Sequence, residues 1–407
     1  MESAKIIARL ARMLKQVGLA EELAQDALVS ALEQWPTTGV PDSPAAWLMT
    51  TAKNRALDEL RRRKLFERSQ ESIAHEAPLL GSAGKRPEEA ADDDIGDDLV
   101  RLMFIACHPV LSTEARTALT LRMLGGLSTA EIARAFLVPE PTIGQRIVRA
   151  KRTLAEARVP FEPPRAEERA ARLSSVLEVI YLIFNEGYAA TSGEDWMRPA
   201  LCDEALRLGR ILAELLPHEA EVHGLVALME IQASRTGARV DAEGEPILLL
   251  AQNRARWDQL MIRRGLAALG RAQSLGAASG PYALQGAIAA CHARAPTAAD
   301  TNWTQIVALY DALAQIAPSP VVELNRAVAV SMAFGPAAAL ELVEALRTEP
   351  RLKNDALLPS VRGDLLEKVG RFNEARTEFS RAAGLTQNAR DKKLLLGRAA
   401  ACGGGAQ

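Results

Sequence analysis

The sequence predicts an all-α protein that is built from several domains. Apolar residues recur at spacings of three and four, whereas alternation of β-branched with polar residues is almost absent. Aromatic residues make up only 4% of the chain, and alanine, leucine and arginine are abundant. At about 100–200 residues for each domain, the 407 residues suffice for two to four helical domains.

The composition excludes several classes of protein. No apolar run approaches the ~18–20 residues that span a membrane, and the N-terminus is too highly charged for a secretory signal. Cys107, Cys202, Cys291 and Cys402 have neither CxxC spacing nor a set of nearby histidines. This pattern argues against a zinc ribbon and a disulfide framework, and it suits a reducing compartment. We expect a cytoplasmic protein with no membrane contact, no metal and no cofactor.

Charge is distributed unevenly along the first 165 residues. The stretch 67–98 holds ten acidic and three basic residues, whereas the rest of residues 1–165 holds twenty basic and thirteen acidic ones. The acidic stretch also contains glycine, serine and proline, so it is predicted to be a solvated linker that does not fold alone. The alternative is an acidic strap between two nucleic-acid-binding blocks, lying in a positively charged channel.

Residues 111–156 have the signals of a helix-turn-helix. A support helix is expected over 111–124. Ser128 and Glu131 then form a capping box at the start of a short helix. Val138-Pro139 predicts a turn, after which a second helix follows. This order of elements is that of DNA-binding helix-turn-helix proteins.

The second helix of this pair has one face that suits DNA. Its apolar residues recur at helical spacing and are predicted to face inward: Ile143, Ile147, Ala150 and Leu154. The opposite face and its flank carry Thr142, Gln145, Arg146, Arg149, Lys151 and Arg152. Arginine and glutamine make bidentate contacts with guanine and adenine edges, and arginine and lysine also neutralise phosphates. The alternative is a basic face that is only solvated.

Residues 1–66 are organised around a helix that starts at Ser43-Pro44. Opposite its apolar arc, the polar arc includes Trp47, Asn54, Arg55, Asp58, Arg61 and Arg62. A tryptophan beside asparagine and arginine can hold a single strand by stacking and by backbone contacts, although an ordinary amphipathic surface helix has the same pattern. In the preceding helix, Glu22 and Asp26 are expected on a docking face for a basic partner.

These residues carry a family resemblance. The run PAAWLMTTAKNRALDELRRR resembles the promoter-melting segment of sigma-70 family factors of the extracytoplasmic-function type. The helix before it resembles the segment of that family that grips the β′ clamp helices of RNA polymerase. The run LSTEARTALTLRMLGGLSTAEIARAFLVPEPTIGQRIVRAKRTL resembles region 4, whose helix-turn-helix reads the −35 element.

The resemblance implies an RNA polymerase sigma factor that initiates transcription. Its partners would be promoter DNA and core RNA polymerase, contacted at the β′ clamp and the β flap. The face that begins at Thr142 would contact the −35 element, and the face that begins at Trp47 would contact the −10 element. Glu22 and Asp26 would contact the polymerase.

The rest of the chain resembles the long helical extension with tetratricopeptide-like repeats that one subgroup of the family carries. Residues 358–391 fit one such hairpin, with Gly363 and Phe379 at packing positions. Less regular hairpins are predicted near Pro217 and Pro320. Such hairpins stack into one body whose concave surface suits a peptide or a partner domain, so a regulatory protein is an expected partner.

The predicted domains are residues 1–66 as sigma region 2, 67–97 as acidic linker, 98–159 as sigma region 4 and 166–407 as helical extension. The prolines between residues 160 and 164 favour a hinge before the extension. We expect the extension to control the sigma portion by direct contact, and a requirement for activity is favoured over simple inhibition.

Catalysis is disfavoured by the sequence. His218 and His223 are five residues apart rather than four, and the adjacent side chains of Cys291 and His292 diverge. No glycine-rich phosphate loop is present. Residues 186–188 are expected to form a turn, and the extension's tryptophans are expected to pack: Trp196, Trp257 and Trp303.

Two other hypotheses stay open. One is a conventional helix-turn-helix regulator with a partner- or ligand-sensing helical domain. The other is a helical-repeat enzyme or scaffold whose N-terminal half only binds DNA. The helix that carries Asn54 and Asp58 favours the sigma factor over the conventional regulator, which needs no strand-capturing helix.

Overall fold

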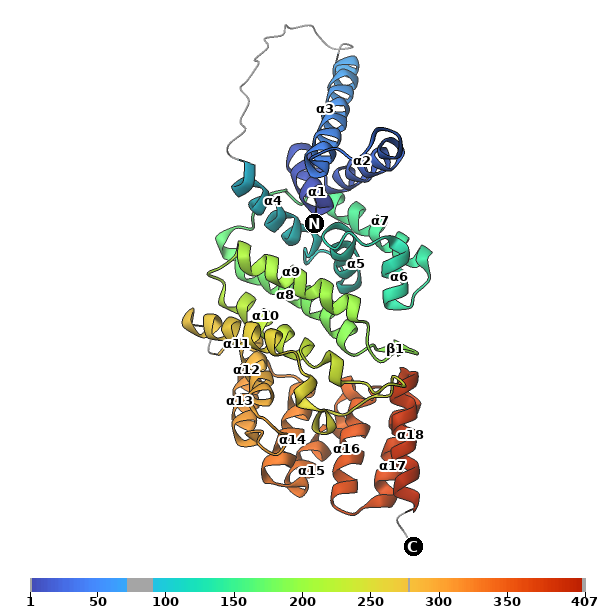
Figure 1. Cartoon of the computed structure of the whole chain (residues 1–407), viewed down its shortest axis with the longest axis vertical. Coiled ribbons are helices and arrows are strands. Elements are labelled where there is room, and N and C mark those ends of the chain that lie inside the picture. Colours follow the sequence, from blue (N-terminus) through green and yellow to red (C-terminus); the bar gives the residue numbers. More distant parts are fainter. Residues whose placement is uncertain (1, 72–90, 277–278, 405–407) are drawn as a thin grey trace. The chain divides into compact units, whose positions relative to one another are not determined.

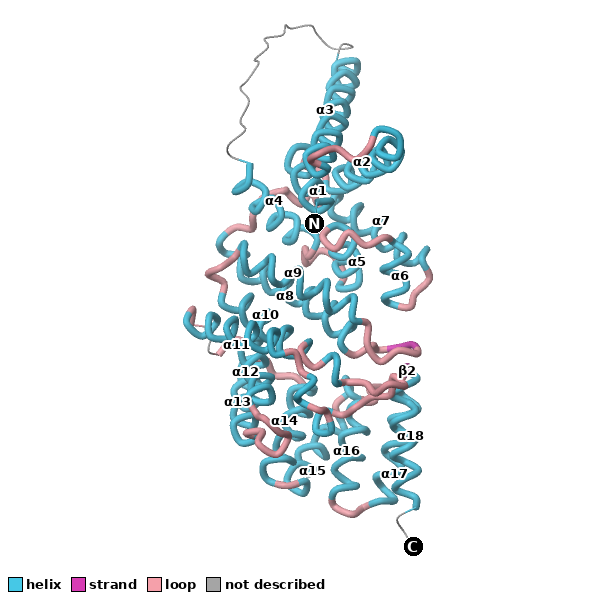
Figure 2. Tube along the Cα trace, in the orientation of Figure 1, coloured by secondary structure: helices cyan, strands magenta, loops and turns pink. Residues whose placement is uncertain are grey.

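The structure, a computed structural model, describes residues 2–71, 91–276 and 279–404. It divides into two compact units, unit 1 (Met1–Val179) and unit 2 (Ile180–Gln407). The boundary falls inside helix α8 (Ala166–Tyr188). Within the described residues the regular elements are helices apart from one pair of two-residue strands, and loops and turns connect them (Figures 1 and 2). The prediction of an all-α protein is therefore confirmed.

Unit 1 contains seven helices and the first part of α8 among its described residues. They are α1 (Glu2–Leu14), α2 (Val17–Thr38), α3 (Pro44–Glu71), α4 (Ala91–Ala106), α5 (Thr113–Met123), α6 (Thr129–Phe136) and α7 (Glu140–Glu156). Because α3 continues to residue 71 and α4 begins at residue 91, both ends of the predicted linker 67–97 are helical. Residues 72–90 of that linker lie outside the described residues.

Helix α1 lies at the centre of the packing of α1 to α4. Its apolar residues follow the helical period, and Ile6, Ile7 and Leu10 are fully buried where α1 packs against α2, α3 and α4. Helix α2 contributes a stripe of small buried residues, and α3 buries Ala52 and Ala56. These small side chains allow the helix backbones to approach closely. Because α3 buries its apolar arc in this contact, its polar arc faces outward.

The helix-turn-helix forms as predicted. Ser128 Oγ accepts a hydrogen bond from Glu131 N at 3.1 Å, and Glu131 Oε2 accepts one from Ser128 N at 2.7 Å, which completes the capping box. Helix α6 then ends at Leu137, whose φ of 50° is in the left-handed region. The predicted inward stripe of α7, Ile143 to Leu154, is buried.

Unit 2 is a series of helices in which sequential neighbours pack against one another. They are α9 (Pro199–Leu215), α10 (Ala220–Ala233), α11 (Gln259–Ser274), α12 (Pro281–Arg294), α13 (Trp303–Ile316), α14 (Pro320–Phe334), α15 (Pro336–Ala345), α16 (Leu357–Lys368), α17 (Phe372–Leu385) and α18 (Ala389–Gly404). Short 3₁₀ turns lie at η1 (Thr236–Ala238), η2 (Leu249–Ala251), η3 (Arg254–Arg256), η4 (Leu346–Thr348) and η5 (Pro350–Leu352). This arrangement is a tetratricopeptide-like helical repeat.

The hairpin of α16 and α17 shows why the repeat requires a small residue. A Cβ atom on Gly363 would lie 2.8 Å from the ring of Phe379, which is fully buried. Only glycine therefore lets this ring sit against the backbone of α16. The hairpin predicted for residues 358–391 is confirmed, and α14 begins at Pro320 as predicted.

Two strands connect the beginning and the end of unit 2. Strand β1 (Ser192–Gly193) pairs in parallel with β2 (Gln387–Asn388). The buried Asn388 side chain donates hydrogen bonds to the carbonyls of Ala190, at 3.1 Å, and Asp195, at 2.8 Å. No pattern in the sequence indicated this pairing.

The predicted turn at residues 186–188 is wrong, because α8 continues to Tyr188. Gly187 serves a close approach between helices instead of a turn. A Cβ atom there would lie 2.6 Å from the backbone nitrogen of Cys202 in α9.

Candidate nucleic-acid interface

The outward face of α7 carries most of the residues that the sequence analysis assigned to the upstream DNA element. Gln145, Arg149 and Arg152 are exposed, and Thr142 and Arg146 are half-buried. Arg152 Nε lies 2.6 Å from Glu156 Oε1, and this contact raises the pKa of the guanidinium.

Val148 lies on this face and is 64% exposed, although the sequence analysis did not select it. An exposed valine between Gln145 and Arg149 suits apolar contact with a thymine methyl group. Its exposure could have been predicted from its position in the sequence, because Val148 falls outside the apolar stripe of α7 that is buried.

Lys151 is placed differently from its neighbours on α7. Its ammonium group donates to Oε2 of Glu21 in α2, and Arg122 Nε of α5 donates to Oε1 of the same carboxylate at 2.9 Å. Glu21 is only 4% exposed. One buried carboxylate thus joins α2 to both α5 and α7 within unit 1. Its role was not predicted, because its two partners lie 101 and 130 residues away in the chain.

Four of the residues predicted to contact the −10 element share the exposed face of α3. Asn54, Asp58, Arg61 and Arg62 are all exposed, at spacings of four, three and one residues. Arg61 Nη1 lies 3.1 Å from Asp58 Oδ1, an exposed pair that contributes little to stability. This face therefore offers an amide, a carboxylate and two guanidinium groups to a ligand.

Trp47 and Arg55 instead contact α2. The ring of Trp47 packs edge-on against Trp35, with 5.5 Å between centroids. Arg55 Nη2 donates to Ser30 Oγ at 2.6 Å, and its Nη1 lies 3.1 Å from Asp26 Oδ2. The structure thus pairs a residue predicted to bind DNA with one predicted to bind the polymerase.

Helix α2 presents a mixed acidic and apolar stripe. Glu22 and Asp26 are exposed, and Val29 and Leu32 continue the same stripe with 49% and 76% of their surfaces exposed. The sequence analysis found the acids and missed the two apolar residues. Exposed aliphatic residues beside acids are typical of a surface that docks a protein with basic and apolar groups.

A second buried carboxylate lies within α4. Asp98 in α4 is fully buried, and its carboxylate lies 2.8 Å from Arg101 Nη1 and 3.6 Å from guanidinium nitrogens of both Arg9 and Arg12 in α1. Asp98 is the last residue of the acidic stretch 67–98. The carboxylate of Asp98 therefore lies among arginines. For this residue alone, the arrangement is the one expected of an acidic strap that lies among basic groups.

The first part of α8 packs on α4 and α5 inside unit 1. Ser175 Oγ donates to the carbonyl of Cys107 at 2.6 Å and accepts a hydrogen bond from Arg116 Nη1 at 2.5 Å. Arg172 Nη2 donates to the carbonyl of Phe104 at 2.7 Å. The helix that contacts α4 and α5 in this way is the one that continues into unit 2.

The cysteines of the described residues are poor nucleophiles. All four are buried free thiols, and burial raises the pKa of Cys107 to about 11 and that of Cys202 to about 12. Among the described residues, no three His, Cys, Asp or Glu side chains gather as a metal site would require. No helix in this part of the chain combines the length and hydropathy needed to cross a membrane.

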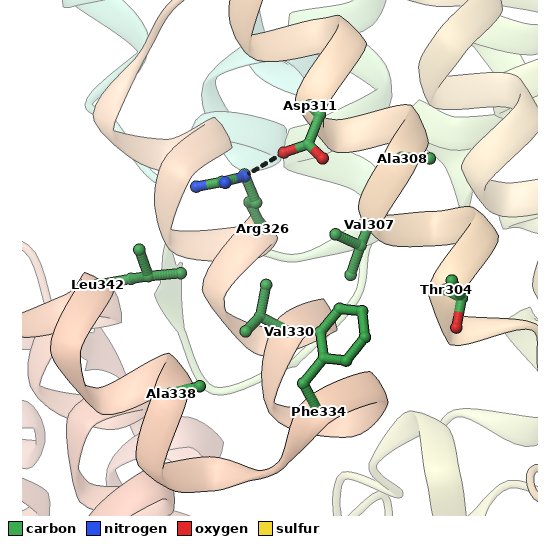
Figure 3. Close-up of a pocket in the computed structure, with 9 residues that line it drawn as sticks. All are labelled: Thr304, Val307, Ala308, Asp311, Arg326, Val330, Phe334, Ala338 and Leu342. Atoms are coloured by element: carbon green, nitrogen blue, oxygen red, sulfur yellow. Dashed lines mark hydrogen bonds and ion pairs between the residues drawn. The ribbon is translucent and has the colours of Figure 1, made fainter.

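Unit 2 has an open groove of about 500 Å³ over α13, α14 and α15 (Figure 3). Its apolar wall includes Val307, Val330 and Phe334, which is 62% exposed. At its polar end, Arg326 Nε lies 2.6 Å from Asp311 Oδ1. A groove with an exposed aromatic ring and a charged end suits an amphipathic peptide.

Comparison with known families assigns the three parts of the chain. The model of sigma-70 region 2 matches residues 3–66, and that of sigma-70 region 4 matches residues 101–154. Residues 172–273 match a family of unknown function, DUF6596.

Several relatives extend these matches. The extracytoplasmic-function RNA polymerase sigma factor SigL of Mycobacterium tuberculosis (strain ATCC 25618 / H37Rv) is 31% identical over 157 residues, which are 38% of this chain and 82% of SigL. An uncharacterised protein of Rhizobium meliloti (strain 1021) is 46% identical over 390 residues, which are 95% of this chain and 90% of that protein. Among solved structures, yeast Tom70 matches at 13% identity with a TM-score of 0.33 over 99% of this chain and 82% of that one, too low a score to carry an argument.

The chain belongs to the sigma-70 family of RNA polymerase sigma factors, in the extracytoplasmic-function type. Members of this family direct core RNA polymerase to promoter DNA. The chain is therefore a sigma factor with a long C-terminal helical domain, and this finding decides against the conventional regulator.

Proposed function

We propose that α7 reads the −35 element and that the exposed face of α3 captures the −10 element. The observation that carries this proposal is that both helices bury an apolar arc and expose a polar one. On α7, Gln145 and Arg149 would contact base edges, and Arg152 would contact phosphate. On α3, Asn54 and Asp58 would hold an unstacked base, with Arg61 and Arg62 near the backbone.

The stripe on α2 would dock on the β′ clamp of the polymerase, and region 4 would contact the β flap. Glu22 and Asp26 would supply the acidic groups, and Val29 and Leu32 the apolar contact. The protein would act in the cytoplasm and would carry out no catalysis of its own.

The free protein would bind promoter DNA weakly. Lys151, one of the residues expected to contact DNA, is engaged by the buried carboxylate of Glu21, which also joins region 2 to region 4. Binding to core polymerase would separate these regions and release Lys151. Nanomolar, sequence-specific binding of DNA by the free chain in physiological salt, unchanged by core enzyme, would contradict this.

The C-terminal domain would control the sigma portion, and would be required for activity. Its support is α8, which packs on α4 and α5 through Arg172 and Ser175 and runs on into unit 2 without a break. The groove that exposes Phe334 would bind a regulatory protein through an amphipathic segment.

Transcription with core polymerase tests this control. We would compare the full chain with residues 1–165 and residues 1–190 on a cognate promoter selected from genomic fragments. If unit 2 is required, only the full chain restores full transcription. If 1–165 equals the full chain, and the separated parts do not cross-link, the extension is an independent binding module.

The −10 assignment has its own test. Asn54→Ala should reduce formation of the open complex more than binding to core polymerase, because the amide acts only on separated strands. Asp42→Ala, an exposed change in the loop before α3, is the matched control. If the Asn54 variant melts the promoter normally, as seen by permanganate reactivity, Asn54 does not belong to this site.

A further inference from the structure

A second candidate site lies inside unit 2, away from every residue assigned to DNA or polymerase. It is a cavity of about 230 Å³ lined by residues of α8, α10, α12, α13 and α14 and by the segments that follow α10. Its polar lining includes Tyr181, Arg235, Gln285, His292, Tyr310 and Asn325. None of its lining residues is an aspartate or a glutamate.

Arg235 is the one lining residue with a permanent charge, and it has no carboxylate partner among the described residues. Its Nε is buried and makes no hydrogen bond. The residue as a whole is half-buried. The cavity therefore contains a partly desolvated cation without a carboxylate partner among the described residues, and an anion would supply the missing counter-charge.

The neighbours of Arg235 add to this positive character. His292 is buried, its Nδ1 has no hydrogen-bond partner, and burial together with the nearby guanidinium groups of Arg235 and Arg254 lowers its pKa to about 4. Arg254 is held by the carbonyls of His292, at 2.6 Å, and Ala295, at 2.7 Å. The lining thus has one positive group, Arg235, and a neutral imidazole, His292, while Arg254 adds positive charge from outside the lining.

A purely structural arginine in the same unit looks different. Arg239 is buried with its Cζ 3.5 Å from the ring centroid of Tyr188 and 4.5 Å from that of Trp196, so aromatic faces enclose the cation. The Cζ of Arg235 lies 5.5 Å and 5.8 Å from its nearest ring centroids, near the outer limit of a cation–π contact. Stacking therefore stabilises Arg239 far better than Arg235.

We propose that this cavity binds a small organic anion, whose carboxylate or phosphate group pairs with Arg235 and accepts a hydrogen bond from His292. The guanidinium fork matches either oxyanion in a bidentate geometry. A volume of about 230 Å³ holds roughly seven or eight waters, which limits the ligand to a small metabolite of about that many non-hydrogen atoms.

The rest of the lining indicates what else the ligand carries. Tyr181 Oη donates to Gln285 Oε1 at 3.2 Å, and Gln285 Nε2 donates to the carbonyl of Pro281 at 3.1 Å, which leaves the Asn325 side chain as a neutral polar group in the lining. Burial raises the pKa of Tyr310 to about 12, so its hydroxyl stays protonated. These neutral groups suit a hydroxyl or keto oxygen rather than a second charge.

Binding to the full-length chain tests the proposal directly and does not depend on transcription, so it can fail while the proposed function stands. The probes are acetate, lactate and inorganic phosphate, with acetamide and lactamide as uncharged analogues of equal size. Calorimetric titration and thermal unfolding in low-salt buffer would measure affinity and stabilisation. At least one anion should bind and raise Tm, and its amide should bind at least tenfold more weakly.

Variants locate the site. Arg235→Met should weaken binding of the active anion at least tenfold, Arg235→Lys should retain part of it, and Arg264→Met, which removes an exposed charge of α11, should have no effect. In the absence of ligand, Arg235→Met should unfold at the same temperature as the parent or higher, because it removes a half-buried cation that has no carboxylate partner among the described residues. A merely structural arginine would give a lower Tm.

Three results would overturn the proposal. They are binding of no anion below about 10 mM, equal binding of an anion and its amide, or unchanged binding by Arg235→Met. If Arg235→Met fails to fold, the comparison of anions with amides on the unmodified chain still decides whether the proposal stands.

Discussion

Glu21 and Asp98 in unit 1 are buried carboxylates that each lie among two or three cations, whereas Arg235 in unit 2 is a cation without a carboxylate partner among the described residues. The first arrangement is closed, because each buried carboxylate is neutralised by cations of the same unit. The second is open, because its counter-charge is missing. We infer that the carboxylates of Glu21 and Asp98 join helices in unit 1, whereas Arg235 prepares a ligand site in unit 2.

The largest effect is expected from opening the closed arrangement. Glu21→Ala leaves Arg122 and Lys151 partly buried without their acid, which should cost about 3 kcal/mol of the stability of unit 1. Amide hydrogen exchange in α2, α5 and α7 would measure this locally. Glu22→Ala, one residue away and exposed, should change stability by less than about 0.5 kcal/mol. If Glu21→Ala lowered the stability by as little as the Glu22 variant does, the carboxylate of Glu21 would not join these helices.

The same comparison indicates what could be predicted from the sequence. The capping box at Ser128 and the buried stripe of α7 follow from local spacing, so the helix-turn-helix and its outward face were predicted correctly. The hairpin around Gly363 and Phe379 was predicted for the same reason. These signals need only residues that are neighbours along the chain or on one helix.

Contacts between distant segments could not be predicted. The pairing of Glu21 with Lys151 and the pairing of β1 with β2 join residues more than a hundred positions apart, and no periodicity records them. The turn expected at residues 186–188 failed because Gly187 permits a close helix contact as readily as a turn. The cavity around Arg235 is likewise formed by residues from five helices and from the segments that follow α10.

Acid should destabilise unit 2 through His292. Its pKa falls from 6.5 in the unfolded chain to about 4 in the fold, so the neutral form is favoured when folded. The corresponding stability is complete above pH 6.5 and is lost as the pH falls toward 4, by about 2–3 kcal/mol in total. Calorimetric unfolding between pH 7 and pH 4.5 would show it, and His292→Gln should have a flatter profile. Identical slopes for the two proteins would show that His292 is not held neutral by its surroundings.

A smaller effect is expected at the start of α6. Ser128→Ala removes the oxygen that accepts Glu131 N and should cost about 1 kcal/mol, whereas Ser128→Asp should retain the cap. Hydrogen exchange of residues 129–137 is the readout. Equal protection in both variants would mean that the helix-turn-helix does not depend on its cap. This change alters no buried charge, so it also calibrates the size of the effect at Glu21.

Selection of promoters by the reconstituted holoenzyme tests the central claim most directly, namely that α7 and α3 read two separate elements. Core polymerase with the full chain would transcribe a randomised promoter library, and the transcribed templates would be sequenced. Arg149→Ala should relax preference at one upstream base pair, by about 1–3 kcal/mol, whereas Arg152→Ala should weaken all sequences equally and lower the salt slope by about one. If both variants select the same templates as the parent with equal efficiency, α7 does not read the −35 element.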